Sequence, residues 1–274
     1  MTSVLLTGAT GFIGQAVQAA LAWEDVEVHT VSRRDVDLLD ETAMRSYVGR
    51  IRADVLVHLA WCADPARFWT DPENLTWARR SISLLEAFIE NGGGAFVGAG
   101  TCAEYFAMDT PYAAAKASFW REASRLCARR GVRAVWARIF YAFGPGEAHE
   151  RLLSAALMRL VQGELVVLRE PESRLDYVYV ADVGRAFAKL TRCSEASGEY
   201  DVGMGQARTV MELVRQAAAV AGLDGRLVVG GVEAGSIRMV VADTARLRTV
   251  GWAPEMSLSQ GIARLWSGLR SELQ

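Results

Sequence analysis

The chain has 274 residues, 51% of them hydrophobic, which suffices for one full domain core with a smaller lobe built onto it. A formal charge of −2 gives no field that would concentrate a polyanion, and no apolar run approaches the roughly 20 residues of a membrane span, so we expect a cytoplasmic protein with neither nucleic acid nor a membrane as partner. Four cysteines without paired spacing and three histidines that do not cluster with them predict reduced thiols and no metal site.

Apolar runs of strand length alternate with segments of helical period through the first half of the chain. In chain order we expect a strand over residues 3–7, a helix over 11–23, strands over 26–32 and 54–60, a helix over 74–90, a strand over 95–98, a helix over 112–129 and a strand over 133–140. This alternation is typical of repeated βαβ units. The predicted fold class is therefore α/β, with a doubly wound parallel sheet.

After residue 144 the alternation loosens, and no repeat or long linker marks a clean boundary. The expected pieces are a helix over 149–162, a strand over 165–169, a strand over 176–180 that leads into a helix, and further elements over 199–202, 209–221, 227–229 and 258–272. We therefore predict a first domain over residues 1–144, to which residues 176–192 return. A smaller interleaved C-terminal lobe over 145–274 would bind the substrate.

Three glycines, Gly8, Gly11 and Gly14, lie where the first expected strand runs into the first expected helix. Glycines at these places permit a tight turn, a close approach of the backbone to a pyrophosphate, and close packing of helix on strand, while the helix N-terminus holds the phosphate. The context of strand, loop and helix supports the motif. The first domain is therefore predicted to be a Rossmann-type domain that binds a nicotinamide dinucleotide through Gly8, Thr10, Gly11, Phe12, Ile13 and Gly14.

The second expected strand ends at Ser32, and two arginines follow where an NAD-specific domain carries an acidic residue for the ribose hydroxyls. An arginine such as Arg33 suits the 2′-phosphate of NADP(H), which we therefore favour over NAD(H). Asp35 and Asp37 lie close by, so an acidic contact to the ribose stays open. The candidate cofactor contacts in this region and after the third strand are Ser32, Arg33, Asp37, Leu38, Leu59 and Ala60.

Tyr112 and Lys116 lie one helical turn apart, so their side chains project from the same face of the expected helix. A free tyrosine titrates near pH ~10, and a neighbouring ammonium favours the phenolate, which brings the group towards the working pH. Lys116 is one of only two lysines in an arginine-rich chain, which indicates a need for a compact ammonium. Thr101 lies just beyond the expected strand over 95–98, where its hydroxyl reaches the same substrate oxygen.

These residues resemble the extended short-chain dehydrogenase/reductase family, the group of nucleotide-sugar epimerases, dehydratases and 4-ketoreductases. The resemblance covers nearly the whole chain, because several loose motifs follow one another in the family's order. The motifs are GATGFIG at 8–14, LVHLA at 56–60, GTCAEY at 100–105, YAAAK at 112–116, RIF and GPG at 138–140 and 144–146, DYVYVADV at 176–183, YDVG at 200–203, and ADTARL with GW at 242–247 and 251–252.

The resemblance implies that Thr101, Tyr112 and Lys116 form the catalytic triad, with Tyr112 and Lys116 also at the nicotinamide ribose. It implies a structural role for His58 and a diphosphate contact for Arg238. The substrate-binding candidates are Thr101, Tyr141, Arg174 and Arg238.

Three departures from the family pattern concern the substrate. Only ten residues separate Thr101 from Tyr112, fewer than in relatives, so a loop beside the sugar is short. Tyr141 stands where relatives often carry asparagine, and Leu175 stands where they carry arginine, with Arg174 one place earlier. The family's usual diphosphate contacts are therefore altered in this chain.

The residues that follow Thr101 limit the types of reaction that the sequence predicts. Cys102 and Ala103 occupy the places of an acidic pair in sugar 4,6-dehydratases, and Ala103 stands where epimerases that act beside a carbonyl carry a base. We therefore predict that NADPH reduces the C4 keto group of a nucleotide-activated 6-deoxy sugar, with a proton from Tyr112. The alternative enzyme is a 4-epimerase with bound NAD, and the alternative from another class is a cofactor-binding regulatory or structural subunit. A homodimer is the candidate assembly.

Overall fold

The computed structural model describes residues 1–62, 64, 67–231 and 237–273. The chain divides into two compact units. Unit 1 comprises Met1–Ile139, Val183–Val202 and Ala245–Trp252, and unit 2 comprises Phe140–Asp182, Gly203–Thr244 and Ala253–Gln274. The sequence predicted a boundary after residue 144 and a return over 176–192. In the structure the first stretch of unit 1 ends at Ile139, and two later segments return to it. The first segment contributes a strand, β10 (Gly198–Val202), to the sheet of unit 1, and the second contributes the short helix α8 (Ala245–Thr249), which packs on that strand.

A six-stranded sheet forms the centre of unit 1, and all its pairings are parallel. In spatial order its strands are β2 (Val26–Val31), β1 (Thr2–Thr7), β3 (Val55–His58), β4 (Ala95–Thr101), β5 (Arg133–Ile139) and β10 (Gly198–Val202). Strands β3 and β4 are buried along their whole length, as central parallel strands are. The strand order reverses at β1, and such a switch point is where open α/β sheets bind ligands. The predicted α/β fold is confirmed.

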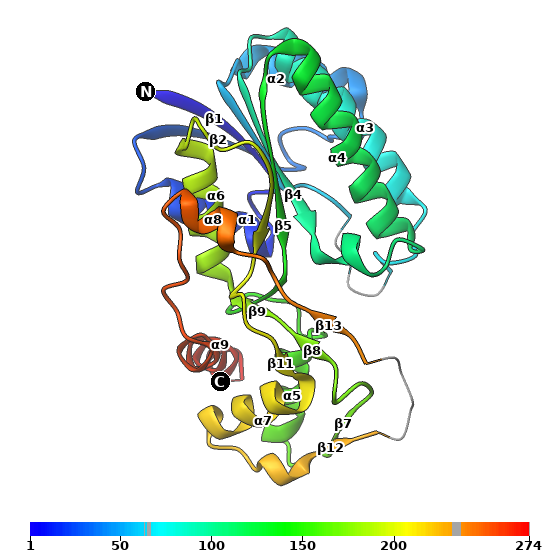
Figure 1. Cartoon of the computed structure of the whole chain (residues 1–274), viewed down its shortest axis with the longest axis vertical. Coiled ribbons are helices and arrows are strands. Elements are labelled where there is room, and N and C mark those ends of the chain that lie inside the picture. Colours follow the sequence, from blue (N-terminus) through cyan, green and yellow to red (C-terminus); the bar gives the residue numbers. More distant parts are fainter. Residues whose placement is uncertain (63, 65–66, 232–236, 274) are drawn as a thin grey trace. The chain divides into compact units, whose positions relative to one another are not determined.

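Helices cover both faces of this sheet (Figure 1). One face carries α1 (Phe12–Leu21) and α6 (Val180–Arg192), and the other carries α2 (Glu41–Ile51), α3 (Glu73–Glu90) and α4 (Pro111–Arg130). Helices α1 and α6 come so close that a Cβ at Gly184 would lie 2.3 Å from the carbonyl oxygen of Ala16. The sequence analysis did not predict α2, in which only Met44 and Val48 are buried.

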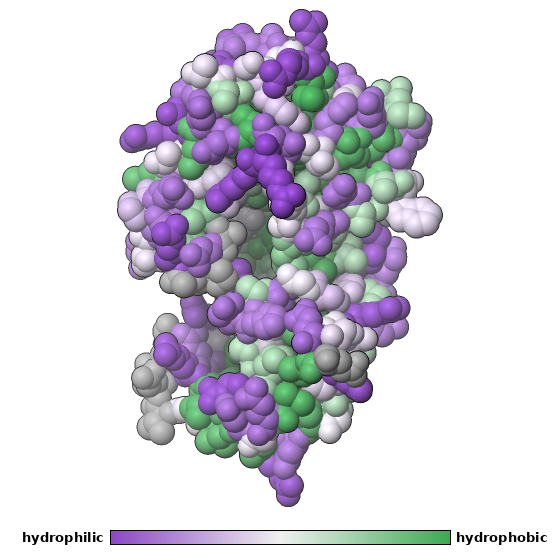
Figure 2. All heavy atoms as spheres, turned by 180° about the vertical axis from the view of Figure 1, so that it is seen from behind, coloured by the Kyte–Doolittle hydropathy of each residue, from purple (hydrophilic) through white to green (hydrophobic). Residues whose placement is uncertain are grey.

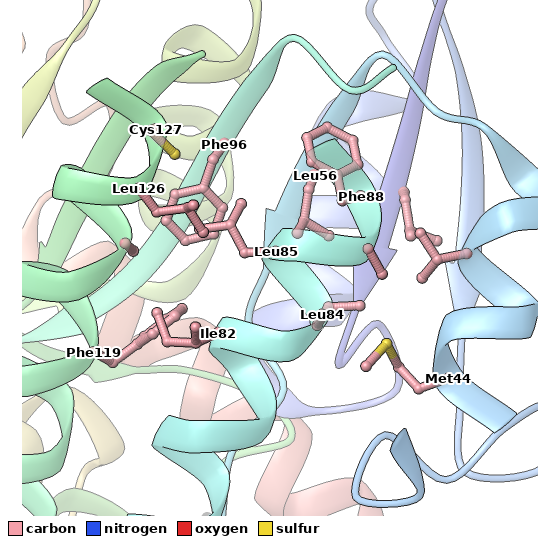
Figure 3. Packing of buried hydrophobic residues seen from close by; sticks show 14 of the residues in the cluster. Met44, Leu56, Ile82, Leu84, Leu85, Phe88, Phe96, Phe119, Leu126 and Cys127 are labelled. Carbon is pink, nitrogen blue, oxygen red and sulfur yellow. The ribbon is translucent and has the colours of Figure 1, made fainter. Parts of the chain in front are cut away.

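The core of unit 1 lies between the sheet and helices α2, α3 and α4, whose apolar side chains point towards β3 and β4 (Figure 3). Aromatic rings fill much of it, since Phe88, Phe96, Phe119 and Trp136 are each at most 1% exposed. A Cβ at Gly98 would lie 2.6 Å from the Trp136 ring. The glycines of β4 therefore make room for the indole below the end of that strand.

Unit 2 consists of small sheets and helices in its described residues. Its strands pair as β6 (Tyr141–Phe143) with β9 (Tyr177–Tyr179), β7 (Val166–Leu168) with β12 (Val228–Gly230), and β8 (Arg174–Leu175) with both β11 (Arg208–Thr209) and β13 (Met239–Val240). Its helical elements are α5 (Leu152–Val161), α7 (Val210–Ala221), the 3-10 turn η2 (Gly225–Leu227) and α9 (Leu258–Glu272). The buried carboxylate of Asp176 accepts hydrogen bonds from the amides of Met204, Gly205 and Ala242, and so joins distant segments.

Hydrophilic residues predominate on the face shown in Figure 2, with hydrophobic residues among them in small groups. Within the described ranges, no helix combines the length and the apolar character that crossing a bilayer requires. The cytoplasmic location expected from the sequence stays a prediction.

Candidate active site

The glycine-rich loop joins the end of β1 to the N-terminus of α1. Gly8 has a φ of +73°, and a Cβ there would lie 2.7 Å from the amide nitrogen of Ala60. A Cβ at Gly14 would lie 1.9 Å from the carbonyl oxygen of Gly8, so helix and loop can approach this closely only without a side chain. No side chain caps α1 at Gly11, and the free amides of a first helical turn are donors to a phosphate. The loop therefore fits the diphosphate of a dinucleotide.

The turn after β2 holds Asp35 and Asp37, the two acidic residues that the sequence offers as ribose contacts. Ser32 donates from its amide at 2.9 Å and from its hydroxyl at 2.7 Å to the carboxylate of Asp35, and these bonds hold the pKa of Asp35 below its usual value. Asp37 accepts from the amide of Leu39 at 2.9 Å. Both acids are thus engaged within their own turn, whereas Arg33 is exposed.

His58 ends β3, is buried, and is bound through both ring nitrogens. Its Nδ1 lies 2.7 Å from the hydroxyl of Thr7, and its Nε2 lies 2.8 Å from the hydroxyl of Ser81. Burial lowers the pKa of His58 to about 3, so the ring is neutral at neutral pH. The amides of Leu59 and Ala60 donate to the same Thr7 hydroxyl, at 3.2 and 3.3 Å. His58 therefore acts structurally, linking strands next to the phosphate loop.

Thr101 is the last residue of β4 and does not lie beyond the strand as predicted. The strand is longer because its pairing with β5 continues as far as Thr101 and Ile139. Thr101 caps the 3-10 helix η1 (Cys102–Tyr105): its hydroxyl accepts from the amide of Ala103 at 3.2 Å, and its own amide donates to the carboxylate of Glu104 at 2.9 Å. The short helix therefore fixes the backbone at this threonine.

Tyr112 lies in the first turn of α4, which Thr110 caps. The tyrosine ring meets Phe68 edge-on with centroids 4.9 Å apart, and it meets Trp69 in the same way at 5.7 Å. The amide of Tyr112 also donates to the carbonyl oxygen of Trp69 at 3.4 Å. The ring is thus held by aromatic contacts that do not depend on its hydroxyl group.

Lys116 lies one turn further along α4 and is only 4% exposed. Its ammonium donates to the carbonyl oxygen of Ala99 at 3.0 Å, and it lies 3.8 Å from the centroid of the Trp61 ring. Burial lowers the pKa of Lys116 from 10.5 to about 7, while the charge of Glu104 acts in the opposite direction. The structure thus brings the three predicted catalytic residues to the end of β4 and the first turns of α4.

Trp61 covers the ammonium of Lys116 in one fixed orientation. Its indole nitrogen donates to the amide oxygen of Asn74 at 2.7 Å. Asn74 is fully buried, and its amide nitrogen donates to the carbonyl oxygens of Phe68 and Asp71, both at 2.7 Å. The sequence analysis assigned Trp61 no role, because these contacts join segments that no motif connects. A large aromatic residue directly after the LVHLA stretch was the available signal.

The three substrate candidates outside unit 1 lie in unit 2. Tyr141 on β6 stacks on Tyr177 of β9, with centroids 5.3 Å apart. Arg174 on β8 is exposed, and its amide donates to the carbonyl oxygen of Arg238 at 2.7 Å. The guanidinium of Arg238 binds the carboxylate of Glu170 at 2.7 Å. The structure thus brings the two arginines onto neighbouring chain segments, and a carboxylate already engages one of them, so their contact with a diphosphate stays a prediction.

Cys62, Asp71 and Glu73 offer ligand atoms within 4.8 Å of one another, although the sequence predicted no metal site. Asp71 accepts from the amide of Glu73 and pairs with Arg67 at 3.2 Å, and Glu73 accepts from the indole of Trp77 at 3.2 Å. Burial raises the pKa of the Cys62 thiol, which disfavours the thiolate that binds metals. We assign no metal to this group.

With this geometry in view, a model of the NAD dependent epimerase/dehydratase family matches residues 4–203. The chain belongs to this family. It is therefore an enzyme, an NAD(P)-dependent oxidoreductase, and the resemblance to the extended short-chain dehydrogenases is confirmed. The close approach at Gly8 and Gly14 fits the dinucleotide that such an enzyme binds.

Relatives of this chain include both reductases and epimerases. The chain is 25% identical over 308 residues to GDP-6-deoxy-D-mannose reductase of Pseudomonas aeruginosa, covering 99% of this chain and 98% of that protein. The structure of RMD from Pseudomonas aeruginosa complexed with NADPH matches with a TM-score of 0.85 and 25% identity, over 99% and 100% of the two chains. UDP-glucose 4-epimerase of Thermus thermophilus complexed with NAD matches with a TM-score of 0.84 and 25% identity, over 98% and 99%.

Proposed function

We propose that this enzyme uses NADPH to reduce the C4 keto group of a nucleotide-activated 6-deoxy sugar. The observation that carries the proposal is the arrangement around Thr101. The two residues that follow it, Cys102 and Ala103, are 6% and 1% exposed and carry no carboxylate, so they supply no acid and base for elimination. Tyr112 serves as the proton donor, as plain hydride transfer requires. The likeness to a GDP-6-deoxy-D-mannose reductase over 99% of this chain supports the substrate class.

Each member of the triad has one task in this proposal. Bound NADPH supplies the hydride that reduces the carbonyl carbon. The hydroxyl of Thr101 donates a hydrogen bond to the carbonyl oxygen, and Tyr112 transfers its phenolic proton to that oxygen. The ammonium of Lys116 stabilises the phenolate that remains. The backbone of the Gly8–Gly14 loop holds the diphosphate of the dinucleotide.

The reaction itself gives the first test. With a nucleotide-linked 4-keto-6-deoxyhexose, we expect one NADPH to be consumed for each alcohol formed, because a reductase releases its cofactor in every cycle. The loss of NADPH absorbance and the amount of product are measured in the same sample. The reductase proposal fails if the purified protein carries tightly held NAD(H) and interconverts two hydroxy sugars without net oxidation.

The cofactor preference is proposed to be NADP(H) over NAD(H). The support is local: Asp35 and Asp37 are bound within their own turn, while Arg33 is exposed beside them. An arginine there suits a 2′-phosphate. We expect Arg33→Ala to remove most of the difference between the Kd values for NADPH and NADH, measured by calorimetry. Arg34→Ala is the control, since it removes the same charge one position further, and equal affinities in the unaltered protein would refute the preference.

The second candidate function is a nucleotide-sugar 4-epimerase that retains NAD. The likeness to the NAD complex of the Thermus thermophilus epimerase favours it, because that fold match covers 98% of this chain. Such an enzyme oxidises and then reduces the same carbon with the same triad, so the geometry of Thr101 and Tyr112 serves it equally. The cofactor measurement above separates the two functions. The homodimer expected from the sequence stays a prediction.

A further inference from the structure

A buried carboxylate lies directly behind Thr101. The side chain of Glu104 is only 4% exposed, although it belongs to the short helix η1. It accepts from the amide of Thr101 at 2.9 Å, from the indole of Trp136 at 3.1 Å and from the Nε of Arg138 at 2.9 Å. Donors from β4 and β5 thus surround an acid that the proposed mechanism does not use.

The position of this carboxylate is set by close packing. A Cβ at Gly100 would lie 2.9 Å from Oε1 of Glu104 and 2.4 Å from the indole nitrogen of Trp136. Glycine at this place of β4 therefore lets the carboxylate and the indole lie against the strand. The carboxylate is held on the backbone that ends in Thr101, one of the proposed catalytic groups.

The charge of Glu104 is only partly balanced by its arginine. Arg138 also pairs with Glu199, at 2.7 Å, so that two carboxylates share one guanidinium. Lys116 is a second buried cation nearby: its ammonium donates to the carbonyl oxygen of Ala99, and the charge of Glu104 raises its pKa. An ammonium at Lys116 therefore adds positive charge beside a guanidinium that already serves two carboxylates.

Other titratable groups around Lys116 do not supply this charge. Tyr112 lies on the same helix, one turn earlier, and is the proposed proton donor. His58 on β3 is neutral at neutral pH, because burial lowers its pKa to about 3. Arg138 on β5 is a cation, so it opposes a second positive charge. Glu104 on η1 is the anion that acts on the lysine.

We propose that Glu104 is a positioning residue of this active site, which fixes the backbone of Thr101 and provides the negative charge that keeps Lys116 an ammonium. The proposal rests on the function proposed above for Thr101 and Lys116. It predicts that a neutral residue at 104 changes the protonation of Lys116 and the pH dependence of the reaction. If the carboxylate only stabilised the fold, its replacement would change neither the protonation of Lys116 nor the pH dependence of the reaction.

Glu199 provides a matched control. Like Glu104, it pairs with Arg138 and accepts from an indole, that of Trp120 at 2.6 Å. Unlike Glu104, it has no bond to Thr101 and is not among the groups that shift the pKa of Lys116. Each of the variants Glu104→Gln and Glu199→Gln therefore removes one carboxylate that pairs with Arg138. Only Glu104→Gln removes a carboxylate that also binds the amide of Thr101.

The test follows the two lysines of the chain by NMR. Protein labelled with ¹³C at the lysine ε carbon gives signals from Lys116 and Lys189, and Lys189→Arg assigns them. We expect the titration midpoint of Lys116 to fall by about one pH unit in Glu104→Gln, the lower end of the effect of a nearby opposite charge. We expect it to stay unchanged in Glu199→Gln. An unchanged midpoint in a folded Glu104→Gln protein, or an equal shift in both variants, overturns the proposal.

Kinetics separate this proposal from the function on which it rests. In a plot of kcat/KM against pH, we expect the inflection point of Glu104→Gln to move with the NMR midpoint of Lys116. The inflection point of Glu199→Gln should stay where it is in the unaltered protein. If the midpoint moves but no keto sugar nucleotide is reduced, the proposed function fails and the charge role of Glu104 stands. If Glu104→Gln does not fold, Glu104→Asp serves instead: it keeps the charge and loses the reach to Thr101. We then expect kcat to fall with the midpoint unchanged, and an unchanged kcat overturns the positioning role.

Discussion

Tyr112→Phe will lower turnover by roughly 10²–10⁴-fold, the usual loss when a general acid is removed, while NADPH binding stays close to that of the unaltered enzyme. The expectation follows from how the ring is held. Its contacts with Phe68 and Trp69 are made by the ring, and phenylalanine keeps them. The substitution removes the hydroxyl group that gives its proton to the carbonyl oxygen. Turnover is measured with a keto sugar nucleotide, and binding by calorimetry with NADPH alone.

Tyr105→Phe is the control for this result. Tyr105 donates to Asp201 at 2.8 Å, and burial raises the pKa of Tyr105 to about 12, so its hydroxyl is a poor proton donor at neutral pH. We therefore expect the Tyr105 variant to retain far more turnover than the Tyr112 variant. Near-normal turnover in Tyr112→Phe would show that the triad assignment is wrong and that another donor, such as Tyr141, must be sought.

Much of the fold could be predicted because its signals are local. The strand, loop and helix around Gly8 follow from residues next to one another, and so does the one-turn spacing of Tyr112 and Lys116. Helix α9, expected over 258–272, has these bounds in the structure. Helix α2, in which only Met44 and Val48 are buried, was not predicted.

The surroundings of the triad could not be predicted, because they depend on contacts between segments distant in sequence. Glu104 lies in the quoted GTCAEY stretch, yet its partners Trp136 and Arg138 come from another strand. Trp61 meets Lys116 only after β3 and α4 pack together. The family resemblance implies a diphosphate contact for Arg238, and no pattern in the sequence indicates that Glu170 binds it. Local patterns therefore predict the catalytic groups, and only tertiary contacts show which residues surround them.

Lys116→Met will abolish turnover and at the same time stabilise the folded protein at neutral pH. Burial lowers the pKa of Lys116 from 10.5 to about 7, so the unfolded chain binds a proton that the folded chain does not, between these two values. Stability of the unaltered protein therefore rises with pH across this window, by up to about 1.4 kcal/mol per pH unit. Below about pH 7 the cost of burying the ammonium, a few kcal/mol, is fully present. Methionine has no such charge, and its thioether packs well against an aromatic ring such as that of Trp61.

The measurement is the free energy of unfolding by urea for both proteins between pH 6 and 10. We expect the variant to be more stable at the acidic end, and the two curves to converge as the pH approaches the ordinary pKa of a lysine, about 10.4. Lys189→Met is the control, because Lys189 is exposed and its replacement should change stability by no more than about 0.5 kcal/mol at any pH. If the difference in the free energy of unfolding between the Lys116 variant and the unaltered protein does not change with pH, Lys116 has the same pKa in the folded and unfolded states. Burial of its ammonium would then not destabilise the folded protein.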